Sequence, residues 1–381
     1  MVVGRRATGR VQRFGHGVPA IGDPPGGKQM DRPSRPTLRD VALRAGVSRT
    51  TASYALAGRA TEMRISDETA DRVLRAAAEL GFSPNRTAQS LRTRRSHTIG
   101  LISDYVAYGE FAGRMLAGAS AAARARGTLV LIGETEGDAS LEQQLIEEML
   151  VRGVDGLVYA TLACRRITVP EALRGTPAVL LNCFDASASL PAVVPDEVEG
   201  GRRIARIVLD AQVDERTVIV GNAEDPTAIA GERRIAGIHA EFAQASRRVS
   251  GHIQSRWEVG AAFDEVSRAL ADGPLPTALI CLNDRIAMGA YEALEAAGLR
   301  VPHDVSVVAF DGSNLAQWLR PSVTSVGIPF EQLGALAVDL LLGSADWPGH
   351  AITLPMPVIA GASVRAVGQP GDITPPPIEA G

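Results

Sequence analysis

Short apolar, β-rich runs alternate with longer amphipathic helical patterns over most of this chain, beginning at Ser96. The runs are TIGLI, TLVLIGE, DGLVYA, PAVLLN, RTVIVG, TALICL and DVSVVAF. Helical stretches between them, such as SLEQQLIEEMLVRG, close on glycine, which readily adopts the positive φ found at helix ends. Repeated β–α–β units imply parallel sheets that are covered by helices on both faces.

About 270 residues follow this pattern, which is more than one modest sheet needs, so the sequence predicts two α/β lobes. We expect the chain to pass between the lobes in VVPDEVEGG, residues 193–201, and the later run SVTSVGIP is a candidate for crossing back. Ligands of such folds bind at the carboxyl ends of the strands, which would face the space between the lobes.

The charge of the chain is divided unevenly along its length. The whole sequence has 39 Lys and Arg against 43 Asp and Glu, a formal net charge of −4. Residues 1–97 hold 18 basic and 8 acidic side chains, which leaves 21 and 35 for the remainder, so the two parts carry +10 and −14. A basic head on an acidic body indicates that the head binds a polyanion.

Several classes of protein are excluded by what the sequence lacks. No apolar run approaches the roughly 18 residues of a membrane span, and no secretory signal is present. The three cysteines are widely spaced without a CxxC pair, which is typical of reduced thiols in a cytoplasmic protein. The six histidines lack metal-ligand spacing, and the GxSxG, HExxH, P-loop and GxGxxG motifs are missing. We therefore expect no catalytic residue, no metal and no cofactor.

The stretch TLRDVALRAGVSRTTASYALAG, residues 37–58, predicts two short helices around a tight corner. The first helix has one apolar face with i, i+3, i+4, i+7 spacing, formed by Leu38, Val41, Ala42 and Ala45. Gly46 permits the turn, Ser48 is placed to cap the second helix, and a third helix runs from Ser66 to Gly81. This pattern is typical of a helix-turn-helix, whose second helix enters the DNA major groove. The alternative is a small helical cap with a solvated polar face.

The second helix would leave four polar side chains on its outer face: Arg49, Thr50, Ser53 and Tyr54. The following SPNRTAQSLRTRRS, residues 83–96, is too short for a stable isolated helix. It is either a plain linker or a helix that forms only against a partner, and Leu91 is then a candidate wedge for the DNA minor groove.

Residues 37–95 resemble the DNA-binding head and hinge of the LacI/GalR family of bacterial transcription regulators. The resemblance lies in TLRDVALRAGVS, SDETADRVLRAAAELGFSPNRTAQSLRT and TIGLI, which have the order and spacing of the family, and it extends more loosely to about residue 365. It implies a three-helix helix-turn-helix head with a hinge helix, followed by a two-lobed α/β core like periplasmic binding proteins. The implied domains are a disordered tail (1–35), the head (36–82), the hinge (83–97), the ligand-binding and dimerisation core (98–365) and a flexible tail (366–381). Translation could begin at Met1 or at Met30.

The resemblance also implies which residues bind DNA. Base edges would be read by Arg49, Thr50 and Tyr54, and phosphates would be bound by Ser48 and Ser53. The remaining implied DNA contacts are Thr37, Leu38, Asn85, Ala88 and Leu91. Ala52 and Tyr54 stand where the family often has Val and Arg, which leaves the operator sequence open.

In the body, GERRIAGIHAEF and CLNDRIAMGAYEAL resemble the family segments that supply a ligand-binding arginine and aspartate. The resemblance implies an effector site made of Asp104, Phe111, Asn182, Arg234, Trp257 and Asp284. Polar groups that bond hydroxyls, beside aromatic faces that stack on a ring, would suit a sugar. Alternatives stay open: Asp284 as a helix cap, Arg234 as a solvated charge, Trp257 as core, and Asp104 and Asp311 as ordinary polar residues at strand ends.

Together these features predict a cytoplasmic homodimer that regulates transcription, is expected to be a repressor, and has no membrane partner. It would bind a pseudo-palindromic double-stranded DNA operator and respond to a small-molecule effector, for which a sugar is the leading candidate. Two rivals are a solute-binding protein of the same two-lobed shape and a sugar-phosphate-processing enzyme with a fused head. The sequence leaves open the effector, the direction of its effect, repression or activation, and dimer or tetramer.

Overall fold

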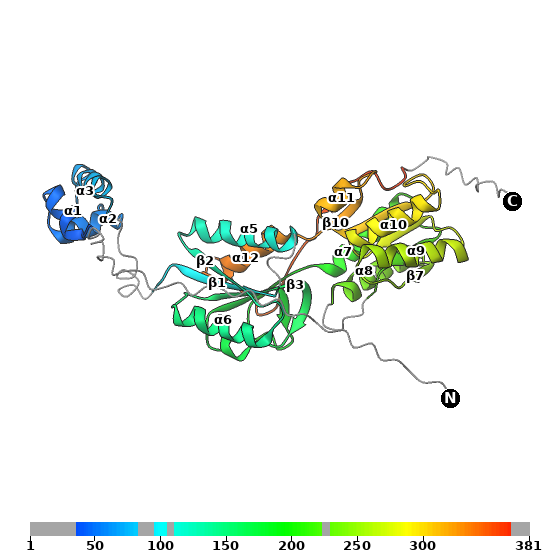
Figure 1. Cartoon of the computed structure of the whole chain (residues 1–381), viewed down its shortest axis with the longest axis horizontal. Helices are drawn as coiled ribbons and strands as arrows, with labels where there is room; N and C mark the ends of the chain where they lie inside the picture. The colour runs from blue at the N-terminus through cyan, green and yellow to red at the C-terminus, as the bar shows by residue number, and fades with distance from the viewer. Residues whose placement is uncertain (1–35, 83–94, 105–109, 223–228, 367–381) are drawn as a thin grey trace, which may run out of the picture. The chain divides into compact units, whose positions relative to one another are not determined.

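The computed structural model describes residues 36–82, 95–104, 110–222 and 229–366. The chain divides into two compact units near residue 86. The first unit contains three helices, α1 (Leu38–Ala45), α2 (Arg49–Leu56) and α3 (Asp67–Leu80) (Figure 1). They enclose a small core of Val41, Ala42, Ala45, Ala52, Ala55, Val73, Ala76 and Ala77. The predicted helix-turn-helix is confirmed, whereas the predicted hinge residues Asn85, Ala88 and Leu91 and almost all of both tails lie outside the described residues.

Local capping explains where these helices begin and end. Thr37 and Asp40 form a reciprocal capping box at the start of α1, and Gly46 ends that helix with a φ of 66°. Ser48 accepts a 3.0 Å hydrogen bond from the backbone N–H of Thr51 and so caps α2. The corner between α1 and α2 is therefore fixed by its own sequence.

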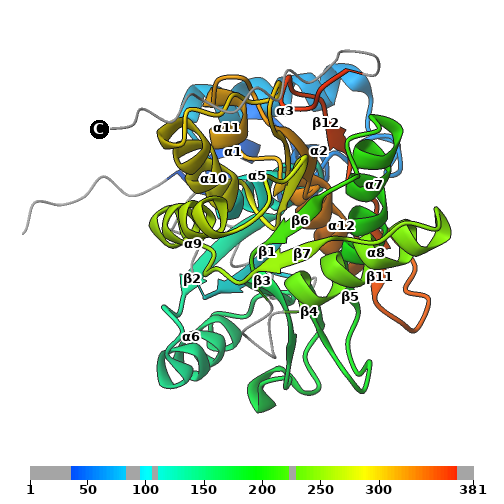
Figure 2. The ribbon, with the colours of Figure 1, turned by 90° about the vertical axis from the view of Figure 1, so that its right-hand side faces the viewer.

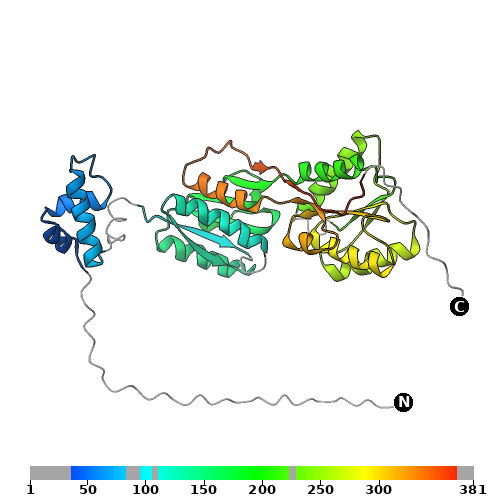
Figure 3. The same ribbon diagram turned by 90° about the horizontal axis from the view of Figure 1, so that it is seen from above.

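The second unit contains two six-stranded sheets, each in its own lobe (Figure 3). The first sheet has the order β11-β5-β4-β3-β1-β2. Its strands are β1 (Thr98–Ser103), β2 (Leu129–Glu134), β3 (Leu157–Ile167), β4 (Ala178–Asp185), β5 (Ala192–Pro195) and β11 (Ile352–Leu354). Helix α6 (Ala139–Val151) lies on one face, and α5 (Glu110–Ala125) and α12 (Phe330–Leu341) lie on the other (Figure 1).

The second sheet has the order β12-β10-β9-β8-β6-β7, with β12 as its antiparallel edge strand. Its strands are β6 (Thr217–Val220), β7 (Gly251–Ile253), β8 (Ala278–Cys281), β9 (Ser306–Asp311), β10 (Thr324–Gly327) and β12 (Val358–Ile359). Helices α7 (Glu197–Asp210) and α8 (Ala230–Gln244) lie on one face, and α9 (Val259–Asp272) and α10 (Asp284–Ala296) on the other (Figure 2). The short α11 (Asn314–Trp318) follows β9. The predicted two-lobed α/β core is confirmed.

The chain crosses between the lobes three times. It first crosses between β5 and α7, within the predicted segment 193–201. The predicted crossing strand, β10, itself pairs with β9 in the second sheet, and the chain returns to the first lobe directly after it, in α12. It crosses again between β11 and β12. None of the described helices is long and apolar enough to span a membrane.

Close contact between α5 and α12 depends on glycine. A Cβ at Gly118 would overlap the carbonyl oxygen of Glu331, whereas a Cβ at Gly113 on the same helix would meet no atom within 4 Å. We therefore expect Gly118→Ala to lower the free energy of unfolding by about 1–3 kcal/mol through overpacking. Gly113→Ala, the matched control, should raise it by about 0.5–1 kcal/mol because alanine favours helix. Urea titration of both variants measures the difference, and equal effects would contradict the close helix contact.

Candidate functional site

The outer face of α2 carries the side chains predicted to read DNA. Arg49 and Thr50 are exposed, whereas Ser53 and Tyr54 are half-buried. Ser48 also acts as the helix cap, and its Oγ lies 2.9 Å from Thr51 Oγ1. The face therefore presents an exposed guanidinium, an exposed hydroxyl and an aromatic ring from a single helix.

Thr37 and Leu38 have structural roles within the head. The Thr37 hydroxyl donates a 2.7 Å hydrogen bond to Asp40 Oδ2, and the Thr37 backbone N–H donates to the same oxygen at 2.8 Å. These bonds hold the pKa of Asp40 below its usual value. Leu38 is half-buried and packs against the head core. These internal contacts do not test whether Thr37 or Leu38 also contacts DNA, which stays a prediction.

Arg59, in the loop after α2, is a neighbour of the recognition face that the sequence did not single out. Its guanidinium lies 5.5 Å from the centre of the Tyr54 ring, and its Nε donates a 2.7 Å hydrogen bond to Glu62. The Arg59–Glu62 pair thus lies against one face of Tyr54. Its only sequence signal is a basic residue shortly after the helix, which has little specificity.

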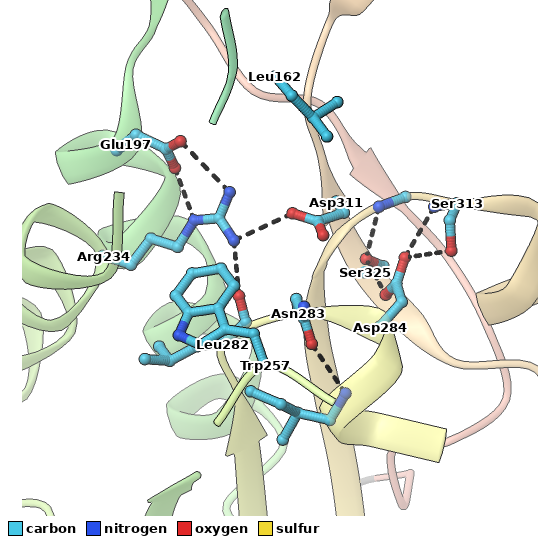
Figure 4. A network of polar contacts seen from close by, with 12 residues as sticks. Leu162, Glu197, Arg234, Trp257, Leu282, Asn283, Asp284, Asp311, Ser313 and Ser325 are labelled. Carbon is cyan, nitrogen blue, oxygen red and sulfur yellow. Dashed lines mark hydrogen bonds and ion pairs between the residues drawn. The ribbon is translucent and has the colours of Figure 1, made fainter. Parts of the chain in front are cut away.

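In the second lobe, Arg234 lies at the centre of a buried polar network (Figure 4). Its side chain is only 1% exposed, so the interpretation of Arg234 as a solvated charge is wrong. Its Nε and Nη2 donate to the two carboxylate oxygens of Glu197 at 2.7 and 3.2 Å. Its Nη1 donates to the Leu282 carbonyl at 2.6 Å and to Asp311 Oδ1 at 3.0 Å. These bonds occupy four of the five N–H groups of a guanidinium.

The close approach of α7 and α8 brings Glu197 to Arg234. A Cβ at Gly201 would overlap the Arg234 carbonyl, and a Cβ at Gly237 would overlap the carbonyl of Val198. Both glycines therefore allow the two helices to touch along their backbones. Glu197 was not predicted from the sequence, because an acidic residue in the first turn of a helix is ordinarily a favourable surface charge.

Asp284 is buried and is bound by Ser313, which caps α11, and by Ser325 in β10. It accepts hydrogen bonds from the Ser313 backbone N–H at 2.7 Å, from Ser313 Oγ at 2.8 Å and from Ser325 Oγ at 2.9 Å. The cap of α10 is Asn283, whose Oδ1 accepts from the Ile286 N–H at 2.8 Å, so the interpretation of Asp284 as the cap is wrong. Burial and the nearby Asp311 carboxylate raise the pKa of Asp284 to about 7.

Two further residues complete the second-lobe group. The pKa of Asp311 is raised by burial against the opposing effect of Arg234, so Asp311 is not an ordinary solvated strand end. Trp257 is half-buried, and its Nε1 donates to the Asn222 carbonyl at 2.9 Å. The Arg234 guanidinium lies 5.6 Å from the Trp257 ring centre. Trp257 therefore belongs to the polar network as well as to the adjoining core.

Two predicted site residues of the first lobe, Asp104 and Asn182, bond the middle of β3, where its pairing with β4 shifts register. Asp104 accepts a 2.9 Å hydrogen bond from the Leu162 N–H and pairs with Arg165 at 2.9 Å. The Asn182 amide donates to the Thr161 and Leu162 carbonyls at 3.0 and 2.9 Å.

Phe111 stands apart from this group and stacks on Phe330, with ring centres 5.1 Å apart. Leu162 faces the Arg234 network across the lobes (Figure 4). Within the described ranges, no hydrogen bond or ring contact joins the predicted first-lobe residues to Arg234, Trp257 or Asp284, and no cluster of metal-ligating side chains occurs.

Comparison with known proteins agrees with the two-unit organisation. Residues 37–85 match the family of bacterial regulatory proteins of the lacI type, and residues 199–364 match the periplasmic binding protein-like domain. The ribose operon repressor of Haemophilus influenzae is 29% identical over 308 residues, which cover 80% of this chain and 91% of that protein. The HTH-type transcriptional repressor PurR of Erwinia tasmaniensis is 30% identical over 316 residues, which cover 80% and 89% of the two chains.

Solved structures of similar fold include the lac repressor dimer bound to operator and the anti-inducer ONPF. That structure has a TM-score of 0.69 and 25% identity, and the match covers 87% of this chain and 99% of the repressor. A complex of the transcriptional regulator CelR with cellobiose has a TM-score of 0.58 and 26% identity, with coverage of 86% and 100%. These matches agree with the order of the head and the two-lobed core along the chain. The chain belongs to the LacI family of bacterial regulatory proteins.

Proposed function

We propose that this protein is a cytoplasmic transcriptional repressor that binds an operator as a homodimer, and that a small-molecule effector, for which a sugar is the leading candidate, changes its affinity for the operator. The observation that carries the DNA-binding part is the outer face of α2, where exposed Arg49 and Thr50 lie beside Tyr54 on the second helix of a helix-turn-helix. The match of residues 37–85 to the regulatory family supports it.

The recognition face is tested by comparing operator variants. We expect Tyr54→Ala and Arg49→Ala to change which base pairs are preferred, by about 1–3 kcal/mol per affected pair. Arg75→Ala removes the same charge from an exposed position on α3 and is the matched control, which should lower affinity slightly and equally for all operators. Binding titrations at fixed salt on an operator library decide between these outcomes. A uniform loss with all three variants would contradict base reading by α2.

Dimerisation is supported by an apolar edge on the first sheet. Strand β2 is one of the two edge strands of this sheet, and its Leu129, Leu131 and Ile132 are 61%, 36% and 47% exposed. An exposed apolar edge strand favours association with another chain. The similarity to a repressor dimer on its operator supports a second copy as the partner, and one head on each copy would read one half of a pseudo-palindromic operator.

The effector is proposed to bind between the Arg234 network and the first-lobe residues Asp104 and Asn182. A sugar is favoured because one relative is a ribose operon repressor and one structural neighbour holds cellobiose. A panel of sugars, sugar phosphates and nucleobases should contain a compound that changes operator affinity. Recovery of that compound unchanged after incubation is expected of a regulator, and its conversion to a product would instead support the enzyme alternative.

A further inference from the structure

We propose that Glu197 determines which charge the effector can carry. By pairing with the guanidinium of Arg234, it excludes phosphorylated and carboxylated ligands. The site then selects a neutral or cationic ligand rich in hydrogen-bond donors, such as a polyol or an amino sugar. This inference rests on the proposed effector site and specifies the chemistry of its ligand.

The first step concerns the availability of Arg234. An arginine binds phosphate or carboxylate through two parallel N–H donors, and Glu197 already receives this bidentate contact from Nε and Nη2. Both side chains are at most 1% exposed. An anionic ligand would have to displace a buried carboxylate that has no other partner within hydrogen-bond distance among the described residues, leaving a buried charge unpaired.

The second step concerns the net charge of the network. Two carboxyl groups, Glu197 and Asp311, bond the single guanidinium of Arg234, and a third, Asp284, acts electrostatically on Asp311. Arg233 and Arg285 act on this group from nearby, but Arg285 is exposed and Arg233 half-buried, so water screens both. The hydrogen-bonded group itself therefore carries excess negative charge when its carboxyl groups are ionised.

The third step concerns the polar atoms that remain available. Asn182 Oδ1 is a buried acceptor without a partner among the described residues, and Asp311 has one carboxylate oxygen beyond the oxygen that Arg234 contacts. The first-lobe cation, Arg165, is likewise paired with a carboxylate, Asp104. Two buried donors, Arg165 Nε and Asn222 Nδ2, are also without a partner among the described residues. Donors and acceptors are therefore both available, while the guanidinium groups of Arg234 and Arg165 are each paired with a carboxylate. This favours a ligand with hydroxyl groups, which donate and accept hydrogen bonds and carry no negative charge.

Inorganic phosphate is a direct probe of this arrangement. We expect Glu197→Ala to bind phosphate at least tenfold more tightly than the wild-type chain, because the variant frees the Nε and Nη2 donors of Arg234 that bond Glu197 in the wild type. Glu197→Gln, which keeps the size of the side chain, is the second variant in case the alanine variant fails to unfold cooperatively. Glu199→Ala, on the same helix but at a partly exposed ion pair, should leave phosphate binding at the wild-type level. Calorimetric titration at constant ionic strength measures binding. Phosphate bound at Arg234 should change the fluorescence of the neighbouring Trp257, and loss of that change in a Glu197→Ala/Trp257→Phe variant would locate the bound phosphate there.

In the phosphate titration, either of two results would overturn the proposal: phosphate binding by the wild-type chain with a change in Trp257 fluorescence, or folded Glu197 variants that gain no phosphate binding. Matched ligands give a second test in the operator assay, with glucose, glucosamine and glucose 6-phosphate, and with ribose and ribose 5-phosphate. Release of operator by a phosphorylated member alone would also overturn it, with the regulatory function intact. Absence of operator binding by the wild-type chain would instead reject the proposed function, while the phosphate titration would still decide the role of Glu197.

Discussion

Replacing Arg234 by methionine is expected to lower the free energy of unfolding of the core by about 3–5 kcal/mol, because it leaves two buried carboxyl groups without their cation. The side chain of Glu197 is 0% exposed and that of Asp311 is 12% exposed, and Arg234 bonds both. Chemical denaturation of the wild-type and variant chains, monitored by circular dichroism, measures the loss. Arg233→Met, at the adjacent half-buried position, is the matched control and should cost less than about 1 kcal/mol.

The pH dependence gives this prediction a distinctive signature. Burial already raises the pKa of Glu197 and Asp311 in the folded chain, and loss of Arg234 raises both further. A carboxyl group whose folded pKa is raised stabilises the fold below its unfolded pKa and loses that contribution as pH rises through the folded pKa. The deficit of Arg234→Met should therefore be largest at neutral pH and shrink on acidification toward pH 4 to 5. A deficit that is constant over this range would show that lost packing, and not unpaired charge, is responsible.

Replacing Ile132 by glutamate is expected to abolish dimerisation and to reduce operator affinity by about 10²–10⁴-fold. The exposed apolar edge of β2 would then bear a charge that the partner copy has to bury. Operator binding would depend on one head instead of two linked heads, and the advantage of linkage is of this size. Sedimentation measures the assembly, and titration of operator DNA at fixed salt measures the affinity.

Val151→Glu is the control for this variant. Val151 ends α6 in the same lobe and is 84% exposed, so the same charge there should leave both assembly and operator affinity unchanged. Both variants should fold as single chains with the circular dichroism spectrum of the wild type, because both positions are exposed on the single chain. A dimer that persists in Ile132→Glu with unchanged operator affinity would contradict the assignment of β2 to the subunit interface.

The sequence by itself determined the elements whose signals are local. Apolar runs such as TIGLI and TALICL predicted β1 and β8, and Ser48 and Gly46 predicted the corner between α1 and α2. A cap or a buried face depends on residues a few positions apart, so its chemistry can be recognised in the sequence. The strands β7, β11 and β12 were not predicted, because two or three residues are too few to display a period. Strand β5 was not predicted because it overlaps the segment 193–201, which was interpreted as the passage between the lobes.

Only the tertiary structure decided how the polar site residues are used. Arg234 meets Glu197 across 37 residues of sequence and Asp311 across 77, and Asp284 binds Ser325 across 41. These partners depend on helix packing and on the order of strands, to which Gly201 and Gly237 contribute by letting two backbones touch. The sequence supplied an arginine and an aspartate of the right kind at the right helices. Whether the arginine is free for a ligand or already paired is decided by which side chain the fold buries beside it, because a buried charge needs a partner and local sequence does not specify which one.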